Sequence, residues 1–366
     1  MNGQLLKVAV IGNGMIANVA HIPAWKHLTD DVEVVAVADP RDEVAEETAR
    51  RYGIPKSYKD PQKMLNEVKP DIVSVCTPNV YHREWTLAAL KAGANVLCEK
   101  PITTSYVGAK EMFDTARAGG RLLYVSQTSR FTTDYMAAKE VAKSGRLGRI
   151  YYGEIAAIRR RGIPMWGFFH MKEHNAGGPL YDLGVHIIDA LFWMMDNPAV
   201  ASVSGATYLE LGNKNENLAT SLADSGAPAG TFRPRTYDWH EFNVEDLATG
   251  YIRMQDGATI LFRTSWAVNM PENYAVYLAG TQAGLALPGP KIIENDGRYM
   301  AEIALKVQPN QNVNFPGHWR VVENFVGVLK GKEEQVVKEA EVLNVIRTIE
   351  ALYRSAEEKR EIRIGE

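Results

Sequence analysis

The chain has 366 residues, a length that suits about two domains, each able to bury its own hydrophobic core. Its 41 basic and 44 acidic residues nearly cancel to a net charge of −3, so no strong positive field is available to bind nucleic acid or an anionic membrane. The two cysteines exclude a disulfide framework, and no secretory leader or long apolar span is visible. We therefore expect a cytoplasmic protein.

The first third of the chain predicts a doubly wound α/β domain. Residues 6–11 form a β-branched run, residues 15–28 have the apolar spacing of a helix, and residues 32–39 form a second apolar run. Short apolar runs and helical segments go on alternating as far as residues 121–127. Because this alternation is typical of βαβ units, we expect a parallel Rossmann sheet over residues 1–127.

Beyond residue 127 the pattern changes to longer runs of period two. They lie at residues 150–161, 201–211, 244–254, 259–268 and 274–280, and Gln255-Asp256-Gly257 has the composition of a hairpin turn. Helices are expected at 180–195, 318–330 and 337–358. We therefore predict that residues 128–366 form an α+β domain for substrate binding, with a large, mostly antiparallel open sheet.

The second domain has an open sheet and a long polar stretch. Its open sheet must cover an exposed face, which predicts a homodimer or homotetramer. The polar stretch at residues 213–240 is too long to be an ordinary loop of a compact domain. It is either a functional lid or a dispensable insertion.

A glycine-rich turn joins the first strand to the first helix. The turn has the sequence Gly12-Asn13-Gly14-Met15-Ile16-Ala17. This fits G-x-G-x-x-(G/A), in which the first glycine makes the turn, the second admits a pyrophosphate, and the small last residue lets helix approach strand. Asp39, at the end of the second strand, suits the ribose hydroxyls of NAD and repels the extra phosphate of NADP. Arg41 suits that phosphate, so NAD is expected and NADP stays an alternative.

Two further polar segments follow later strands of the predicted parallel sheet, where ligands bind in such sheets. They are Thr77-Pro78-Asn79-Val80-Tyr81-His82 and Glu99-Lys100-Pro101. A lysine at a strand end can hold a substrate hydroxyl and ease its deprotonation. The alternative is a solvated surface lysine, and Lys100-Pro101 is a candidate cis peptide.

Asp182 and His186 lie four residues apart, which places them on one face of a helix. A histidine can accept the proton of an alcohol while hydride leaves the same carbon, and its reference pKa near 6.5 suits both directions. A neighbouring carboxylate would orient it. The alternative is an Asp–His pair that only stabilises the helix.

With TPNVYH at 77–82, EKP at 99–101 and GGPLYDLGVHIID at 177–189, the chain resembles the Gfo/Idh/MocA family of glucose-fructose oxidoreductase-like and inositol dehydrogenase-like enzymes. The resemblance covers essentially the whole chain. It implies a nicotinamide-dependent oxidoreductase with Lys100, Asp182 and His186 as catalytic residues. Together with the motif analysis, it gives the candidate cofactor-binding residues Gly12, Asn13, Gly14, Met15, Ile16, Asp39, Arg41, Thr77, Pro78, Asn79, His82, Glu99 and Lys100.

Other residues carry weaker signals. His170 and His174 have a spacing that suits a metal, but no third ligand is evident, so no metal is predicted. Arg161 and Trp166 precede the catalytic helix and are candidates for lining a sugar pocket, as opposed to a solvated edge. Trp266 is expected in the sheet core or an interface rather than in the site.

The sequence therefore predicts an NAD-dependent dehydrogenase that oxidises a secondary alcohol of a sugar, an anhydrosugar or an inositol-like cyclic polyol. An alternative in the same family is a glycoside hydrolase that oxidises its substrate transiently. A third is an NAD-binding regulator without catalysis, which has no chemical need of Lys100, Asp182 and His186.

Overall fold

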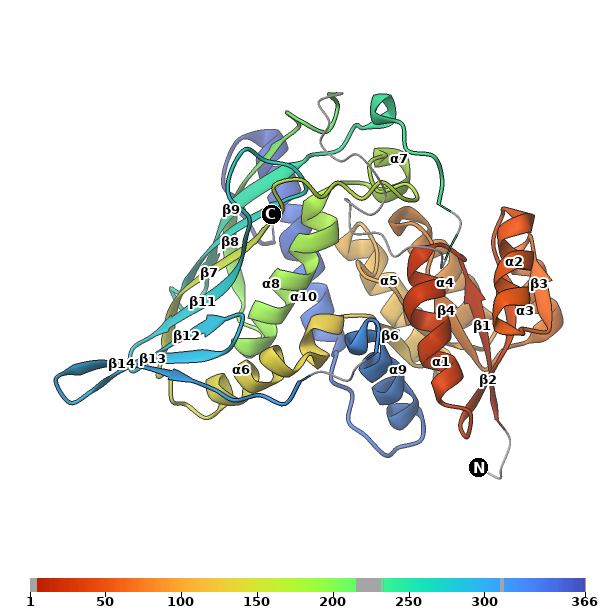
Figure 1. The fold of residues 1–366 in the computed structure, drawn as a ribbon, viewed down its shortest axis with the longest axis horizontal. Helices are drawn as coiled ribbons and strands as arrows, with labels where there is room; N and C mark the ends of the chain where they lie inside the picture. Colours follow the sequence, from red (N-terminus) through yellow and green to blue (C-terminus); the bar gives the residue numbers. More distant parts are fainter. Residues whose placement is uncertain (1–4, 215–231, 233, 310–312, 366) are drawn as a thin grey trace.

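The computed structural model describes residues 5–214, 232, 234–309 and 313–365. Two sheets form the framework, with helices between and around them (Figure 1). The six-stranded sheet belongs to the N-terminal part of the chain, and the nine-stranded sheet to the C-terminal part. The predicted combination of a parallel Rossmann sheet with a mostly antiparallel open sheet is confirmed.

The first sheet is parallel, with the strand order β3-β2-β1-β4-β5-β6. Its strands are β1 (Leu6–Ile11), β2 (Val32–Ala38), β3 (Lys56–Tyr58), β4 (Ile72–Val75), β5 (Asn95–Cys98) and β6 (Leu123–Val125). Its helices are α1 (Ile22–His27), α2 (Asp42–Tyr52), α3 (Pro61–Val68), α4 (His82–Lys91) and α5 (Tyr106–Ala118). The strand order reverses between β1 and β4, and ligands of such sheets bind at this switch point, beyond the carboxyl ends of the strands.

The second sheet has the order β14-β13-β12-β11-β7-β10-β9-β8-β15. Its strands are β7 (Ile150–Ile158), β8 (Val200–Tyr208), β9 (Leu247–Met254), β10 (Thr259–Ser265), β11 (Asn273–Gly280), β12 (Gly284–Leu287), β13 (Lys291–Asp296), β14 (Tyr299–Ala304) and β15 (Ile362–Arg363). The pair β7 and β10 is parallel and the other pairs are antiparallel. The predicted turn at Gly257 joins β9 to β10, with a φ of 88° that suits glycine.

Helices connect the two sheets. They are α6 (Thr133–Lys143), α7 (Lys172–Asn175), α8 (Val185–Met194), α9 (Pro316–Leu329) and α10 (Glu339–Glu358). Helix α8 packs on β7 and α10 packs on β8 (Figure 1). Helix α9 lies against α1, which belongs to the first unit, that is, the six-stranded sheet with its helices. Among the helices that the structure describes, none is long and apolar enough to cross a membrane.

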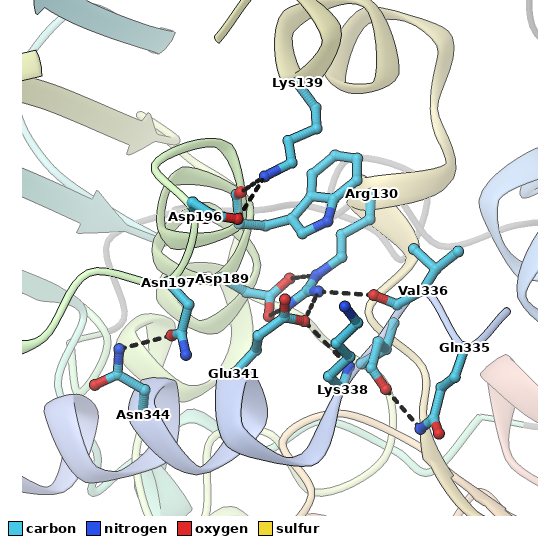
Figure 2. Close-up of polar contacts among 12 residues, drawn as sticks. Arg130, Lys139, Asp189, Asp196, Asn197, Gln335, Val336, Lys338, Glu341 and Asn344 are labelled. Atoms are coloured by element: carbon cyan, nitrogen blue, oxygen red, sulfur yellow. Dashed lines mark hydrogen bonds and ion pairs between the residues drawn. The ribbon is translucent and has the colours of Figure 1, made fainter. Parts of the chain in front are cut away.

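A buried ion cluster holds α8 in place (Figure 2). Arg130 lies in the short helix η3 (Thr128–Phe131), and its guanidinium donates to both carboxylate oxygens of Asp189 at 2.6 and 2.8 Å. It also contacts the Glu341 carboxylate and the carbonyl of Val336. The Arg130 and Asp189 side chains are completely buried. Because Asp189 lies one helical turn beyond His186, this cluster fixes that turn of α8 relative to the end of the first sheet.

Replacing Arg130 by methionine should therefore destabilise the protein strongly. The change leaves the Asp189 carboxylate buried without its partner, and breaking one half of a buried ion pair costs about 3–5 kcal/mol. The matched control is Arg146→Met, because Arg146 pairs with Glu294 at the exposed surface and should contribute no more than about 1 kcal/mol. Urea unfolding of both variants measures the difference, and equal losses would contradict the assignment.

Candidate active site

The glycine-rich turn has the geometry that a dinucleotide requires. Gly12 has a φ of 85°, and a Cβ on it would lie 2.7 Å from the carbonyl oxygen of Cys76, so any side chain there collides with the neighbouring strand end. A Cβ on Gly14 would instead meet open space. Ala17 is completely buried, which explains why a small residue suffices at the third position. The turn is thus shaped for close approach of a ligand at Gly14.

The Asp39 carboxylate accepts hydrogen bonds from the backbone of the glycine-rich turn and of its own loop. One carboxylate oxygen accepts the backbone N–H of Asn13 at 2.9 Å, and the other accepts the backbone N–H of Arg41 at 3.0 Å. The Arg41 guanidinium closes over the same carboxylate with contacts of 3.0 and 3.2 Å. Both residues that bear on the choice between NAD and NADP are therefore paired with each other at the rim of the turn.

Buried polar atoms without hydrogen-bond partners among the described residues gather along this edge of the first sheet. They are both side-chain polar atoms of Asn13, Thr77 Oγ1, Ser126 Oγ and Gln127 Oε1. Each belongs to a segment that follows β1, β4 or β6. Native proteins rarely leave such atoms unpaired, and a bound dinucleotide carries many groups able to satisfy them. The edge therefore fits a nicotinamide cofactor.

Met15 and Ile16 lie half-buried at the same turn, and Pro78 leads into the short helix that begins at Asn79.

Two of the predicted cofactor-contacting side chains have other partners. Both ring nitrogens of His82 face backbone carbonyl oxygens, that of Pro101 at 2.6 Å and that of Thr77 at 2.8 Å. His82 therefore braces the two polar segments against each other. Asn79 donates its amide to the carbonyl oxygen of Asn175 at 3.1 Å and so ties the first unit to α7.

Lys100 and Asp182 meet across the two units. The Lys100 ammonium donates to a carboxylate oxygen of Asp182 at 2.9 Å and to the backbone carbonyl of Asp182 at 3.0 Å. Lys100 lies just after β5, and its peptide bond to Pro101 is cis. Asp182 lies in a π-helical segment, η4 (Leu180–Gly184), that continues into α8. Their side chains are only 15% and 12% exposed, so the alternative of a solvated surface lysine is wrong.

Trp266 completes the surroundings of Asp182. Its indole N–H donates to the second carboxylate oxygen of Asp182 at 3.0 Å, although the ring itself is completely buried. The expected place of Trp266 in the core is confirmed, and its indole N–H also contacts Asp182. Burial opposes ionisation of Asp182, but Lys100 and Arg159 outweigh it and lower the pKa of this carboxyl to about 2. Asp182 is therefore ionised at neutral pH, and Arg159 is a contributor that sequence reasoning missed.

His186 begins the next turn of the same helix. Its Nδ1 is buried and has no hydrogen-bond partner among the described residues, and Asp182 directs its oxygens to Lys100 and Trp266 instead. The predicted orientation of His186 by the Asp182 carboxylate is thus not what the geometry shows. Burial and the nearby Lys100 lower the pKa of His186 to about 3. The imidazole is therefore neutral over the physiological range, far from its reference value.

A chain of polar contacts lies behind Lys100. His21 Nε2 contacts a carboxylate oxygen of Glu99 at 2.7 Å, and His318 Nε2 approaches the same oxygen at 3.3 Å. His21 Nδ1 faces Ser74 Oγ at 2.7 Å, and the other Glu99 oxygen accepts the Lys100 backbone N–H. Burial lowers the pKa of His21, but Cys76 and Glu99 outweigh it and raise that pKa to about 10. These donors and acceptors satisfy one another as hydrogen bonds and an ion pair, and both Glu99 oxygens are occupied by protein groups.

The remaining candidates have separate partners within the described part of the chain. His170 faces Glu241 at 3.5 Å, whereas His174 faces the Tyr81 hydroxyl at 3.1 Å. Arg161 turns to the carbonyl oxygen of Val268. Trp166 is 8% exposed with an unpaired indole N–H among the described residues, and its ring packs edge-on against Phe169. Phe169 in turn packs against Trp266, so an aromatic row leads from Trp166 towards Asp182.

Of the predicted excursion at 213–240, residues 215–231 and 233 lie outside the described part of the chain. Its described end contacts the segment that precedes α7. Arg235 forms an ion pair with Glu241 at 2.6 and 2.7 Å, and its guanidinium lies over the ring of Phe168.

Comparisons with known proteins agree with this geometry. Residues 6–127 match the oxidoreductase family with an NAD-binding Rossmann fold, and residues 135–286 match the GFO/IDH/MocA C-terminal domain. The chain is 36% identical to D-glucoside 3-dehydrogenase of Escherichia coli over 98% of this chain and 97% of that protein. It is 25% identical to scyllo-inositol 2-dehydrogenase (NADP(+)) IolW of Bacillus subtilis, over 98% and 95% of the two chains.

Solved structures show the same fold at lower identity. A levoglucosan dehydrogenase in complex with NADH and levoglucosan superposes with a TM-score of 0.80 at 19% identity, covering 99% of this chain and 100% of that one. An oxidoreductase domain protein from Kribbella flavida gives a TM-score of 0.82 at 20% identity, with coverage of 99% and 100%. With a Rossmann unit that binds NAD and a matching C-terminal domain, the chain belongs to the Gfo/Idh/MocA family of NAD(P)-dependent oxidoreductases.

Proposed function

We propose that this protein is an NAD-dependent dehydrogenase that oxidises one secondary alcohol of a glycoside or closely related cyclic polyol. The observation that carries the proposal is the pairing of Lys100 with Asp182 beside the neutral His186, at the carboxyl end of β5. The full-length likeness to a D-glucoside 3-dehydrogenase favours a glucoside within this class. NAD, when bound, supplies the hydride acceptor.

Lys100 is proposed to hold the hydroxyl that is oxidised. Two of its three N–H donors are directed at Asp182 in the described structure, which leaves a third for a substrate oxygen. A cation at that position stabilises negative charge as it develops on the oxygen. Asp182, held by Lys100 and Trp266, keeps the ammonium in this direction and offers its carboxylate to a further hydroxyl.

His186 is proposed to accept the hydroxyl proton. Its low pKa keeps the imidazole in the neutral form that can accept a proton. The same environment makes the protonated form costly, because burial and Lys100 both disfavour a second positive charge.

The substrate class is tested by supplying methyl glucosides, free glucose, levoglucosan and inositols with NAD and with NADP. We expect net NADH formation at 340 nm on a glucoside, because the proposed reaction ends with the oxidised sugar. Release of the aglycone without net NADH would instead identify a hydrolase that oxidises its substrate transiently. Turnover of none of these compounds would refute the proposal.

The role of His186 predicts an unusual pH dependence. A group with a pKa of about 3 stays neutral above that pH, so kcat/KM for oxidation should show no acid limb from His186 near pH 6.5. Replacing His186 by alanine should lower kcat by about 10²- to 10⁴-fold, the usual contribution of an acid/base group. NADH binding, followed by fluorescence, should stay within about twofold of wild type. A wild-type acid limb at pH 6–7 that disappears in His186→Ala would contradict the lowered pKa.

The Asp39–Arg41 pair underlies a preference for NAD. Asp39→Ser should weaken NAD and improve NADP, because the repelling carboxylate is lost and the guanidinium of Arg41 is released to meet a 2′-phosphate. The double variant with Arg41→Ala should lose the gain for NADP. Steady-state kcat/KM values with both cofactors measure these changes, and a wild-type preference for NADP would refute the assignment.

We also propose a homodimer or homotetramer formed through the second sheet. Large apolar side chains are exposed on strands of this sheet: Tyr277 on β11 is 46% exposed, Ile293 on β13 is 44% exposed, and Met300 on β14 is 94% exposed. The β13–β14 hairpin also extends beyond the rest of the molecule at the left of Figure 1. A second copy would remove this apolar surface from water.

Light scattering at micromolar concentration tests the assembly. We expect a mass at least twice that of the 40.6 kDa chain. A double variant, Tyr277→Glu with Met300→Asp, should shift the mass towards the monomer, because it places charge in the proposed contact. A wild-type monomer would contradict the proposal.

A further inference from the structure

An unpaired buried amide lies next to Lys100. Gln127 is only 2% exposed, and its side-chain oxygen has no hydrogen-bond partner among the described residues. An amide oxygen only accepts hydrogen bonds, and leaving it buried and unpaired costs free energy. A ligand that brings a donor to this position would satisfy it.

The sheet places Gln127 beside Lys100. Val125 on β6 pairs directly with Cys98 on β5, and the Ser126 N–H donates to the Cys98 carbonyl at 2.9 Å. Gln127 and Lys100 each lie two residues beyond that paired position, so both follow the carboxyl ends of adjacent strands. Adjacent strands lie about 4.8 Å apart, which brings the two residues to the same part of the edge.

The buried ion cluster brings the same segment alongside His186. Arg130 follows Gln127 by three residues, and Asp189 follows His186 by three residues. The bidentate Arg130–Asp189 contact therefore joins the two segments one helical turn from Gln127 and from His186 (Figure 2). Gln127 thus lies in the corner formed by the ends of β5 and β6 and the start of α8.

We propose that Gln127 determines specificity by accepting a hydrogen bond from a hydroxyl on the carbon next to the one that is oxidised. Lys100 holds the reacting oxygen, and a vicinal hydroxyl extends from there towards the neighbouring strand end. The nicotinamide half of the dinucleotide lies on the β4–β6 side of the switch point, so the carboxamide of the cofactor is the competing donor. The Arg130–Asp189 link between the Gln127 segment and the helix that carries His186 favours a substrate hydroxyl. The substrate is accordingly a vicinal diol, an inference that rests on the proposed function.

The test pairs Gln127→Met with monodeoxy sugars in a double-mutant cycle. The substrates are methyl β-glucopyranoside and its 2-deoxy, 3-deoxy and 4-deoxy analogues. Methionine keeps the volume and removes the acceptor. We expect kcat/KM of the parent glucoside to fall about 5- to 100-fold in the variant. On wild type, kcat/KM for one vicinal deoxy analogue should be lower than for the parent glucoside by the same factor. For that analogue, Gln127→Met should cause no further loss of kcat/KM.

The matched control is Gln335→Met, the same change at a half-buried glutamine whose amide donates to the carbonyl of Val337. Its kinetic constants should equal those of wild type. The affinity of Gln127→Met for NADH should also stay unchanged. Equal losses for Gln127→Met on the parent and every deoxy analogue, or weaker NADH binding that accounts for the loss, would overturn the inference. Wild type that tolerates every deoxy change would overturn it without any variant.

The proposed function and this inference fail separately. If wild type oxidises none of the glucosides, the proposed function fails, and the same sugars are titrated by calorimetry into the enzyme–NADH complex. The inference then predicts binding that is weakened by Gln127→Met and by loss of one hydroxyl. Equal binding by both proteins, or no binding of any of these sugars, would overturn it.

Discussion

The ion pair between Lys100 and Asp182 is the interaction on which the active site depends. It joins the end of β5 to the helix that carries His186, two elements that are 82 residues apart in the sequence. The charges are nearly buried, so neither can be removed without leaving the other uncompensated. The pair therefore holds the end of β5 against the segment that opens α8, where we propose that cofactor and substrate meet. The completely buried Arg130–Asp189 pair fixes the other end of the same helix turn.

The charges around this pair are arranged to keep His186 neutral. The pKa of Asp182 is held low and that of His21 is raised, so the site contains fixed positive and negative groups whose ionisation does not change near neutral pH. His186 stands among them in a buried position where a positive charge is unfavourable. In the proposed reaction, Lys100 supplies the positive charge and His186 supplies the proton acceptor.

The sequence was most informative where a local rule decides the structure. Gly12 and Asp39 follow from the turn and the strand end that surround them, and the alternating strands and helices determine the first sheet. The short strands β3, β12, β13, β14 and β15 were missed, because runs of two to six residues carry too little periodicity to identify. The segment that opens α8 is π-helical at Asp182, which no spacing rule predicted.

Long-range contacts explain what the sequence does not predict. Trp266 lies in the core as expected, but the contact of its indole N–H with Asp182 depends on the fold. Glu99 directly follows β5 and His82 begins α4, but which partners their polar atoms take depends on segments far along the chain. The contribution of Arg159 to the low pKa of Asp182 could likewise be found only in the folded chain. Local patterns located the site, whereas the hydrogen-bond partners within it came from tertiary packing.

The most direct test of the account is a crystal structure of the protein with NADH and a glucoside that it oxidises. The account predicts that a single sugar hydroxyl lies within hydrogen-bond distance of both Lys100 Nζ and His186, with the hydrogen on its carbon facing the nicotinamide. It also predicts that the Lys100–Asp182 contact persists in the complex. A sugar bound with its reacting hydroxyl away from Lys100, or a Lys100 that leaves Asp182 when substrate binds, would contradict it.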